Sequence, residues 1–102
     1  MTVTEVWTHG TWTVRPGSED DFVDAWRSLA EWTVQEFGTA AAGRLLRDQE
    51  RANVFISFGP WSDLDTVERW RASEGFRDRV AMITRLLDSF EPRTLEPVTQ
   101  VP

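Results

Sequence analysis

Few side chains in this sequence are suited to chemistry, and the shortage narrows the reactions to consider. The chain has no Cys and no Tyr, and His9 is its single His. Thiolate catalysis and Cys-based zinc or iron–sulfur sites are excluded, and no metal-ligand spacing stands out elsewhere. The imidazole of His9 could serve as a general base, because the unperturbed pKa of His is about 6.5. A structural role stays open, since side chains alternate along a strand and His9 would face the dimer barrel if Gly10 faces the pocket.

Aromatic residues are the unusual part of the composition. Six Trp and six Phe stand among 102 residues, and a large amphipathic ring such as Trp needs both packing and a hydrogen-bond partner when it is buried. Two interpretations follow, a Trp-rich core or an aromatic cavity. A cavity of this kind would bind a flat aromatic molecule.

The charges exclude some partners. The net charge is −6 and every basic residue is Arg, which disfavours binding to nucleic acid or to an anionic membrane surface. No apolar run approaches the roughly 18 residues that cross a bilayer. The first ten residues lack a basic start and an apolar stretch, so we expect no signal peptide and a cytoplasmic protein. Four arginines alternate with acidic residues, as on a solvated helix surface: Arg69, Arg71, Arg77 and Arg79. The alternative is that one of them reaches an anionic substrate, and we expect this one to be Arg79.

Patterning divides the chain, which we treat as a single domain over residues 1–102, into six segments. Val, Thr and Trp predict a strand over Val3–Val14, and Ser18 then caps a helix that ends at Gly38. Two short strands with a hairpin turn between them follow, and Pro60 is expected to stop the second. Ser62 opens a second helical region, with a new cap at Ser73. The two short strands are expected over Gly43–Arg47 and Asn53–Gly59. The second helical region continues after Ser73 with an apolar stripe of Phe76, Val80, Ile83 and Leu87. The last segment, Glu91–Val101, is expected to form an edge strand with a tail.

The order β-α-β-β-α-β predicts a ferredoxin-like α+β fold, with two helical regions on one face of a four-stranded antiparallel sheet. The strand around Phe55 places apolar side chains on both faces, with Ile56 opposite Phe55, and Trp7 and Trp12 likewise point to opposite faces. Because the helices cover only one face, we expect a homodimer in which a second copy covers the other.

Three stretches resemble a known family: the Pro16-Gly17 turn into a Phe22/Trp26 helix, the run 55–62 (FISFGPWS) and the run 70–76 (WRASEGF). Together they look like the antibiotic biosynthesis monooxygenase domain of the dimeric α+β barrel superfamily. The resemblance covers residues 5 to 98. It implies a homodimer with a pocket between sheet and helices in each subunit. It also implies oxidation of anthrones, quinols or related aromatics by O2 without metal, flavin or other cofactor.

The resemblance can be carried over residue by residue. Trp61 falls on a Trp that the polyketide oxygenases share, and Ser57 falls on their pocket Asn. Val67 stands where those enzymes have a Tyr. Gly59 stands where many small members have a Glu, and Trp70 where many have a His. The pocket therefore lacks several polar groups that the resemblance would supply.

The heme-degrading branch of the superfamily is excluded by the same comparison. Its Asn, Trp and His positions correspond to Gly10, Trp70 and Val80, so no axial imidazole is present for iron. We expect catalytic roles for Ser57, Trp61 and His9. The expected substrate-binding residues are Trp12, Trp26, Phe55, Val67, Trp70, Phe76 and Arg79.

Two functional hypotheses result. One is a cofactor-independent monooxygenase that acts on a polyketide anthrone or a quinol-type aromatic. The other is a non-catalytic dimeric module of the same fold that binds a small aromatic ligand or has a structural role.

Overall fold

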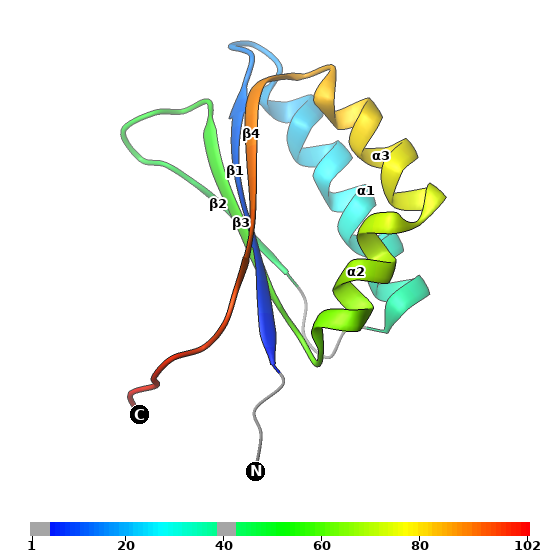
Figure 1. The fold of residues 1–102 in the computed structure, drawn as a ribbon. Coiled ribbons are helices and arrows are strands. Elements are labelled where there is room, and N and C mark those ends of the chain that lie inside the picture. Colours follow the sequence, from blue (N-terminus) through cyan, green and yellow to red (C-terminus); the bar gives the residue numbers. More distant parts are fainter. Residues whose placement is uncertain (1–4, 39–42) are drawn as a thin grey trace.

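The computed structural model describes residues 5–38 and 43–102. A four-stranded antiparallel sheet with strand order β2-β3-β1-β4 carries three helices on one face (Figure 1). This is the predicted ferredoxin-like α+β fold. The elements are β1 (Val6–Val14), α1 (Glu19–Phe37), β2 (Arg44–Arg47), β3 (Val54–Trp61), α2 (Leu64–Ala72), α3 (Glu74–Thr84) and β4 (Leu87–Leu95).

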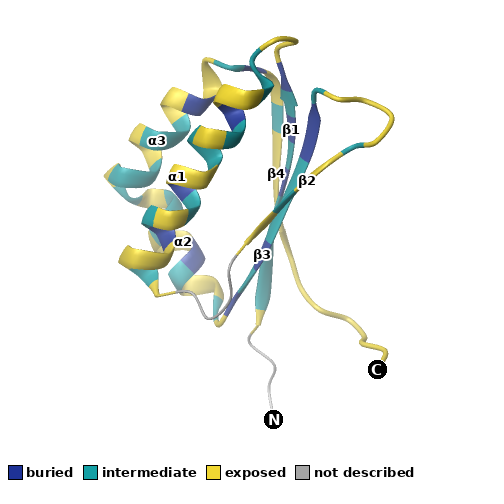
Figure 2. Ribbon diagram, turned by 180° about the vertical axis from the view of Figure 1, so that it is seen from behind, coloured by how far each residue is buried: buried dark blue, intermediate teal, exposed yellow. Residues whose placement is uncertain are grey.

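The core lies between the sheet and the helices, and its buried positions come from β1, β3, β4, α1 and α3 (dark blue in Figure 2). Phe22 of α1 is fully buried, and its ring centroid lies 5.0 Å from Phe55 and 5.4 Å from Trp12. Apolar residues at helical spacing along α1 and at alternate positions along the strands explain this layer. The buried cluster consists of Trp12, Val14, Phe22, Leu29, Phe55, Ile83 and Leu87.

Pro60 does not stop the third strand, contrary to the prediction. β3 continues to Trp61, with Pro60 paired to Trp7 of β1. The other neighbour, β2, pairs with β3 only over Phe55–Phe58. Pro60 therefore lies where β3 has no partner on the β2 side, and a residue without an N–H is tolerated at such a local edge.

The helix caps differ partly from the expected ones. Ser18 occupies the first cap position, but its hydroxyl makes no capping hydrogen bond. Glu19 instead accepts a hydrogen bond from the backbone N–H of Gly17 at 2.7 Å. α2 is capped by Asp63, not Ser62, because the Asp63 carboxylate accepts from the N–H of Thr66 at 2.7 Å. At the start of α2 the acidic Asp63 was therefore a better cap candidate than Ser62, whereas no side chain caps α1.

Ser73 caps α3 as predicted, since its hydroxyl accepts a hydrogen bond from the backbone N–H of Phe76. The last part of the predicted helical stripe is wrong, because Leu87 is the first residue of β4 and pairs with Val14. The last strand therefore starts at Leu87 and not at Glu91. A spacing of four residues from Ile83 suits either a further helical turn or the first inward position of a strand. At the other end of the chain, Val3 lies outside the described residues.

The face of the sheet away from the helices, which we call the outer face, has no element of the described chain packed against it (Figure 1). Register places Pro60 beside Trp7 and Phe58 beside His9 on this face. The Trp7 and Phe58 ring centroids lie 6.2 Å apart. Leu46 and Leu95 are 50% and 46% exposed. Within residues 5–38 and 43–102, no helix has the length and apolar character needed to span a bilayer.

Candidate functional site

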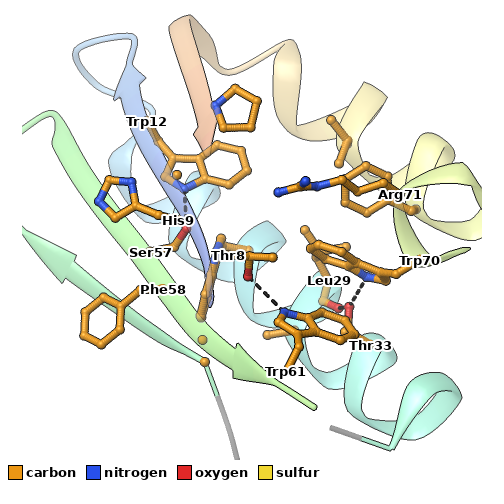
Figure 3. A pocket seen from close by; sticks show the side chains of 18 of the residues that line it. Thr8, His9, Trp12, Leu29, Thr33, Ser57, Phe58, Trp61, Trp70 and Arg71 are labelled. Carbon is orange, nitrogen blue, oxygen red and sulfur yellow. Dashed lines mark hydrogen bonds between the residues drawn. The ribbon is translucent and has the colours of Figure 1, made fainter. Parts of the chain in front are cut away.

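A cavity of about 220 Å³ lies between the inner face of the sheet and the helices. Figure 3 shows Trp12 on one side of it and Trp61 with Trp70 on the other, while Arg71 reaches in from α2. The volume is below the roughly 300–1,000 Å³ of pockets for drug-sized ligands, which favours a compact ligand. The lining comprises Thr8, His9, Gly10, Trp12, Trp26, Leu29, Ala30, Thr33, Val34, Gly43, Ser57, Phe58, Gly59, Pro60, Trp61, Trp70, Arg71, Phe76, Val80, Phe90 and Pro92.

Two indole–hydroxyl pairs link the strands beneath the cavity. The Trp12 indole N–H donates to Ser57 Oγ at 2.8 Å, and the Trp61 indole N–H donates to Thr8 Oγ1 at 3.0 Å. Each bond joins β1 to β3, and Trp12 and Trp61 are only 4% and 6% exposed. A buried indole requires an acceptor, and these hydroxyls satisfy that requirement.

A third pair joins the helices. The Trp70 indole of α2 donates to Thr33 Oγ1 of α1 at 2.9 Å. The Thr33 hydroxyl in turn donates to the carbonyl of Leu29 at 2.7 Å. Since a hydroxyl has one proton to donate, Thr33 has none left for a ligand.

The Ser57 and Thr8 hydroxyls differ from Thr33 in this respect. Each accepts from an indole, but neither donates a hydrogen bond to any group in residues 5–38 and 43–102. With one acceptor position used by the ring, each O–H remains a donor for an oxygen atom of a bound molecule. The indoles therefore fix two hydroxyls as donors beside the cavity.

Gly10 makes room for this arrangement. A Cβ at this position would lie 2.9 Å from the Trp12 indole nitrogen, 2.9 Å from the Phe90 ring and 3.0 Å from Ser57 Oγ. These distances are below van der Waals contact, so any larger residue would displace the Trp12–Ser57 hydrogen bond. The absence of a side chain on β1 thus positions a polar group on β3.

Stacked rings form the walls. The ring centroids of Trp12 and Phe90 lie 3.9 Å apart, and the angle between the two ring planes is 17°. Trp70 lies 4.8 Å from Trp61 and 4.5 Å from Phe76, in tilted and edge-to-face arrangements. Packing of this kind keeps the rings in fixed positions and offers flat apolar surfaces to an aromatic ligand.

The family model for antibiotic biosynthesis monooxygenases matches residues 2–82. The chain belongs to this family. No curated protein sequence gives a match.

Solved structures show the same fold for this monooxygenase family member. One is SnoaB, a cofactor-independent oxygenase from Streptomyces nogalater, with a TM-score of 0.87 at 21% identity over 97% of this chain and 98% of that one. A conserved protein from Methanosarcina mazei gives 0.80 at 18% identity, over 90% and 91%. A third structure, of an antibiotic biosynthesis monooxygenase, gives 0.78 at 20% identity over 92% and 99%. At such identities the likeness is one of fold.

The cavity of this monooxygenase family member brings together many of the residues expected from its sequence. The residues that line it are Ser57, Trp61, Trp12, Trp26, Trp70 and Phe76. His9 borders it on β1, but its imidazole projects from the outer face, as does Phe58 (Figure 3). Within residues 5–38 and 43–102, no three His, Asp or Glu side chains are grouped so as to hold a metal ion.

Three expected substrate-binding residues lie apart from the cavity. Phe55 packs against Phe22 in the core, and Val67 is completely buried. The Arg79 guanidinium lies 4.4 Å above the Trp32 ring and donates to the carbonyl of Gly75. Arg79 is therefore held on the helix surface by a cation–π contact.

Sequence reasoning missed two polar residues of the lining, Thr8 and Thr33, and among the four arginines it chose Arg79 where the cavity is lined by Arg71. Thr8 alternates with Gly10 and Trp12 along β1, so strand periodicity could have placed it on the inner face. Arg71 is four residues after the buried Val67, on the same side of α2.

Proposed function

We propose that the protein is a cofactor-independent monooxygenase that oxidises a small phenolic or enolic aromatic molecule with O2. The observation that carries the proposal is an aromatic cavity whose two available hydroxyl donors, Ser57 and Thr8, are fixed by the indoles of Trp12 and Trp61. Membership of the monooxygenase family supports the same reaction class. A polyketide anthrone or a quinol is the substrate type that we propose.

The reaction needs no redox group from the protein. The substrate loses a proton, and its electron-rich anion transfers one electron to O2, which gives a substrate radical and superoxide. Their recombination forms a C–O bond, and the resulting peroxide takes up a proton. Loss of water from this carbon then leaves a carbonyl group. One oxygen atom ends in the product and the other in water, and all four electrons come from the substrate.

The contribution of this chain is to bind, orient and stabilise the anion. Trp12 and Phe90 on one side and Trp61 and Trp70 on the other hold the substrate rings away from water. The Ser57 hydroxyl donates to the substrate oxygen that carries the developing negative charge. In the described part of the lining no carboxylate is present and the His9 imidazole points away, so no side chain there is placed to take the proton. The proton leaves to solvent, and kcat/KM rises with pH until the substrate itself is ionised.

We also propose that a second copy of the chain covers the outer face. Trp7 and Phe58 contact each other there, and Leu46 is half exposed. Nδ1 of His9 is buried without a hydrogen-bond partner in the described residues. A second sheet packed on this face would cover the apolar side chains, and it could offer a partner to the imidazole.

Oxygen uptake tests the proposed activity. Anthrones and dihydroxynaphthalenes are supplied to the protein in an oxygen electrode, with heat-denatured protein as the measure of spontaneous oxidation. Trp61→Ala removes one wall and the donor to Thr8, and is expected to lower kcat/KM about 100-fold or more, equivalent to about 2.7 kcal/mol. Trp32→Phe is the matched control, since Trp32 lies outside the cavity lining and contacts Phe37 and Arg79.

The outcomes separate the two functional hypotheses. Uptake that Trp61→Ala abolishes and Trp32→Phe leaves intact supports the oxygenase. Tight binding of the same aromatics without O2 uptake above background would reject it in favour of a binding module.

A further inference from the structure

Arg71 is the one side chain in the described cavity lining that carries a charge toward the ligand space. It projects from α2 into the cavity (Figure 3). Its Nη1 donates to Thr94 Oγ1, and its Nη2 donates to the carbonyl of Arg93 at 3.3 Å. The guanidinium thus spans from α2 to β4, held by two neutral oxygens.

No carboxylate within residues 5–38 and 43–102 forms an ion pair with Arg71. Arg69, two residues earlier on the same helix, is paired with Asp65 at 3.3 Å. Arg71 is half buried, and burial lowers the pKa of its guanidinium below the ordinary value. A cation that has lost part of its water without gaining a counter-ion is stabilised by an anion brought from outside.

The remaining donors of Arg71 suit such an anion. A guanidinium has five N–H groups in a planar fork, and the two bonds to β4 leave three of them. Thr94 lies directly opposite Thr8 in the β1–β4 register, so Arg71 is anchored beside the strand position of an available hydroxyl. The fork geometry matches the two oxygens of a carboxylate.

We propose that Arg71 is the specificity-determining residue of the cavity and that the ligand is an aromatic carboxylate. The carboxylate binds to the Arg71 guanidinium and the Thr8 hydroxyl, while the rings extend between Trp12 and Trp61. This inference rests on the proposed function only in taking the same cavity as the binding site. It concerns binding, and it does not require that the bound molecule be oxidised.

A pair of ligands that differ in charge tests the proposal. Quenching of Trp fluorescence is titrated with 2-naphthoate and with the neutral 2-naphthylmethanol, neither of which is expected to react with O2. The Kd of the wild-type protein for 2-naphthoate should be about 10- to 100-fold lower than its Kd for 2-naphthylmethanol. The preference should shrink as the ionic strength rises, because the Arg71 side chain is partly exposed to solvent.

Variants locate the preference. Arg71→Gln should remove it while changing the Kd for 2-naphthylmethanol less than twofold, and Arg71→Lys should restore part of it as a point charge. Thr94→Val, which removes one of the two anchors of the guanidinium, should give an intermediate loss. Arg69→Gln is the matched control and should bind both ligands as the wild type does.

Three results would overturn the proposal: equal affinity of the wild type for both ligands, no binding of either at millimolar concentration, or an equal loss for both ligands in Arg71→Gln. The last would show that Arg71 merely ties α2 to β4. Oxygen uptake without a carboxylate preference would leave the proposed activity standing and reject the role of Arg71. Carboxylate binding without oxygen uptake would do the reverse.

Discussion

The two faces of the sheet are built from the same strands but have different surroundings. On β1 the inward residues Gly10 and Trp12 are buried beneath the helices, whereas the outward Trp7 and His9 are only partly covered. Both faces carry aromatic side chains. The inner face differs because each of its described strand indoles, Trp12 and Trp61, donates a hydrogen bond to a hydroxyl. These bonds fix the positions of polar atoms as well as of rings.

The outer face lacks that organisation. The Trp7 ring contacts Phe58, and the buried Nδ1 of His9 finds no partner in the described residues. A face that is apolar and incompletely satisfied is typical of an interface, whereas a concave apolar face with a few placed donors is typical of a ligand site. Aromatic content alone therefore does not distinguish a binding cavity from an assembly surface, and the hydrogen bonds of the indoles do.

A charged residue on the outer face is the strongest test that this face, and not the inner one, forms the dimer interface. Phe58→Asp places a carboxylate in the proposed dimer interface, where burying it without a partner costs several kcal/mol. We expect the dissociation constant of the dimer to rise by roughly three orders of magnitude, equivalent to about 4 kcal/mol. Light scattering should then give the monomer mass of 11.8 kDa instead of twice that value.

Ser57→Ala is the control for this variant, since it changes the adjacent residue on the inner face. Its mass should equal that of the wild type. A wild-type protein that is monomeric at micromolar concentration, or a Phe58→Asp protein that stays dimeric, would contradict the assignment of the outer face.

A methyl group on the inner face should have the next largest effect. Gly10→Ala places a Cβ within 3.0 Å of Phe90, Trp12 and Ser57, and such overpacking is expected to lower the free energy of unfolding by about 1–3 kcal/mol. Urea denaturation measures the change. Thr11→Val, at the next position but directed to the outer face, should change it by less than about 0.5 kcal/mol. Equal effects of the two variants would mean that the inner face is no more tightly packed than the outer one.

The sequence predicted the layers of this fold better than their ends. Alternation placed Trp7 and Trp12 on opposite faces, and the residues at helical spacing in α1 do pack on the sheet. These patterns succeed because burial acts on many residues of an element at once. The end of β3 depended on a single fact, that β2 is too short to reach Pro60, and pairing between distant strands is not visible in a local pattern.

The candidate site was less predictable for a similar reason. Large rings such as Trp61 and Trp70 could be expected near a cavity from their type and from the family resemblance. Strand alternation could have placed Thr8 on the inner face, but its hydrogen bond from the Trp61 indole, 53 residues later, is not visible in a local pattern. Arg71 and Arg79 are alike in sequence terms, yet one enters the cavity and the other stacks on Trp32. The rotation of each helix about its axis decides between them, and this depends on tertiary packing.

The smallest predicted effect tests the indole hydrogen bonds directly. Trp12→Phe keeps an aromatic ring against Phe90 but removes the N–H that binds Ser57, with an expected loss of about 1 kcal/mol in unfolding free energy. Trp7→Phe makes the same change on the outer face, where the indole N–H donates to no described residue. The effect of Trp7→Phe on stability should be smaller.

Activity separates the two variants further. Without the indole, the Ser57 hydroxyl can rotate to donate elsewhere, so Trp12→Phe should lower kcat/KM in the oxygen-uptake assay about tenfold, equivalent to about 1.4 kcal/mol. Trp7→Phe should leave kcat/KM within twofold of the wild type once the dimer is confirmed by light scattering. A loss in Trp12→Phe that Ser57→Ala reproduces, with no added effect in the double variant, would assign it to the hydrogen bond rather than to the smaller ring. Additive losses would instead mean that the Trp12 ring contributes by its shape, and the inner face would then resemble the outer one more closely than its hydrogen bonds indicate.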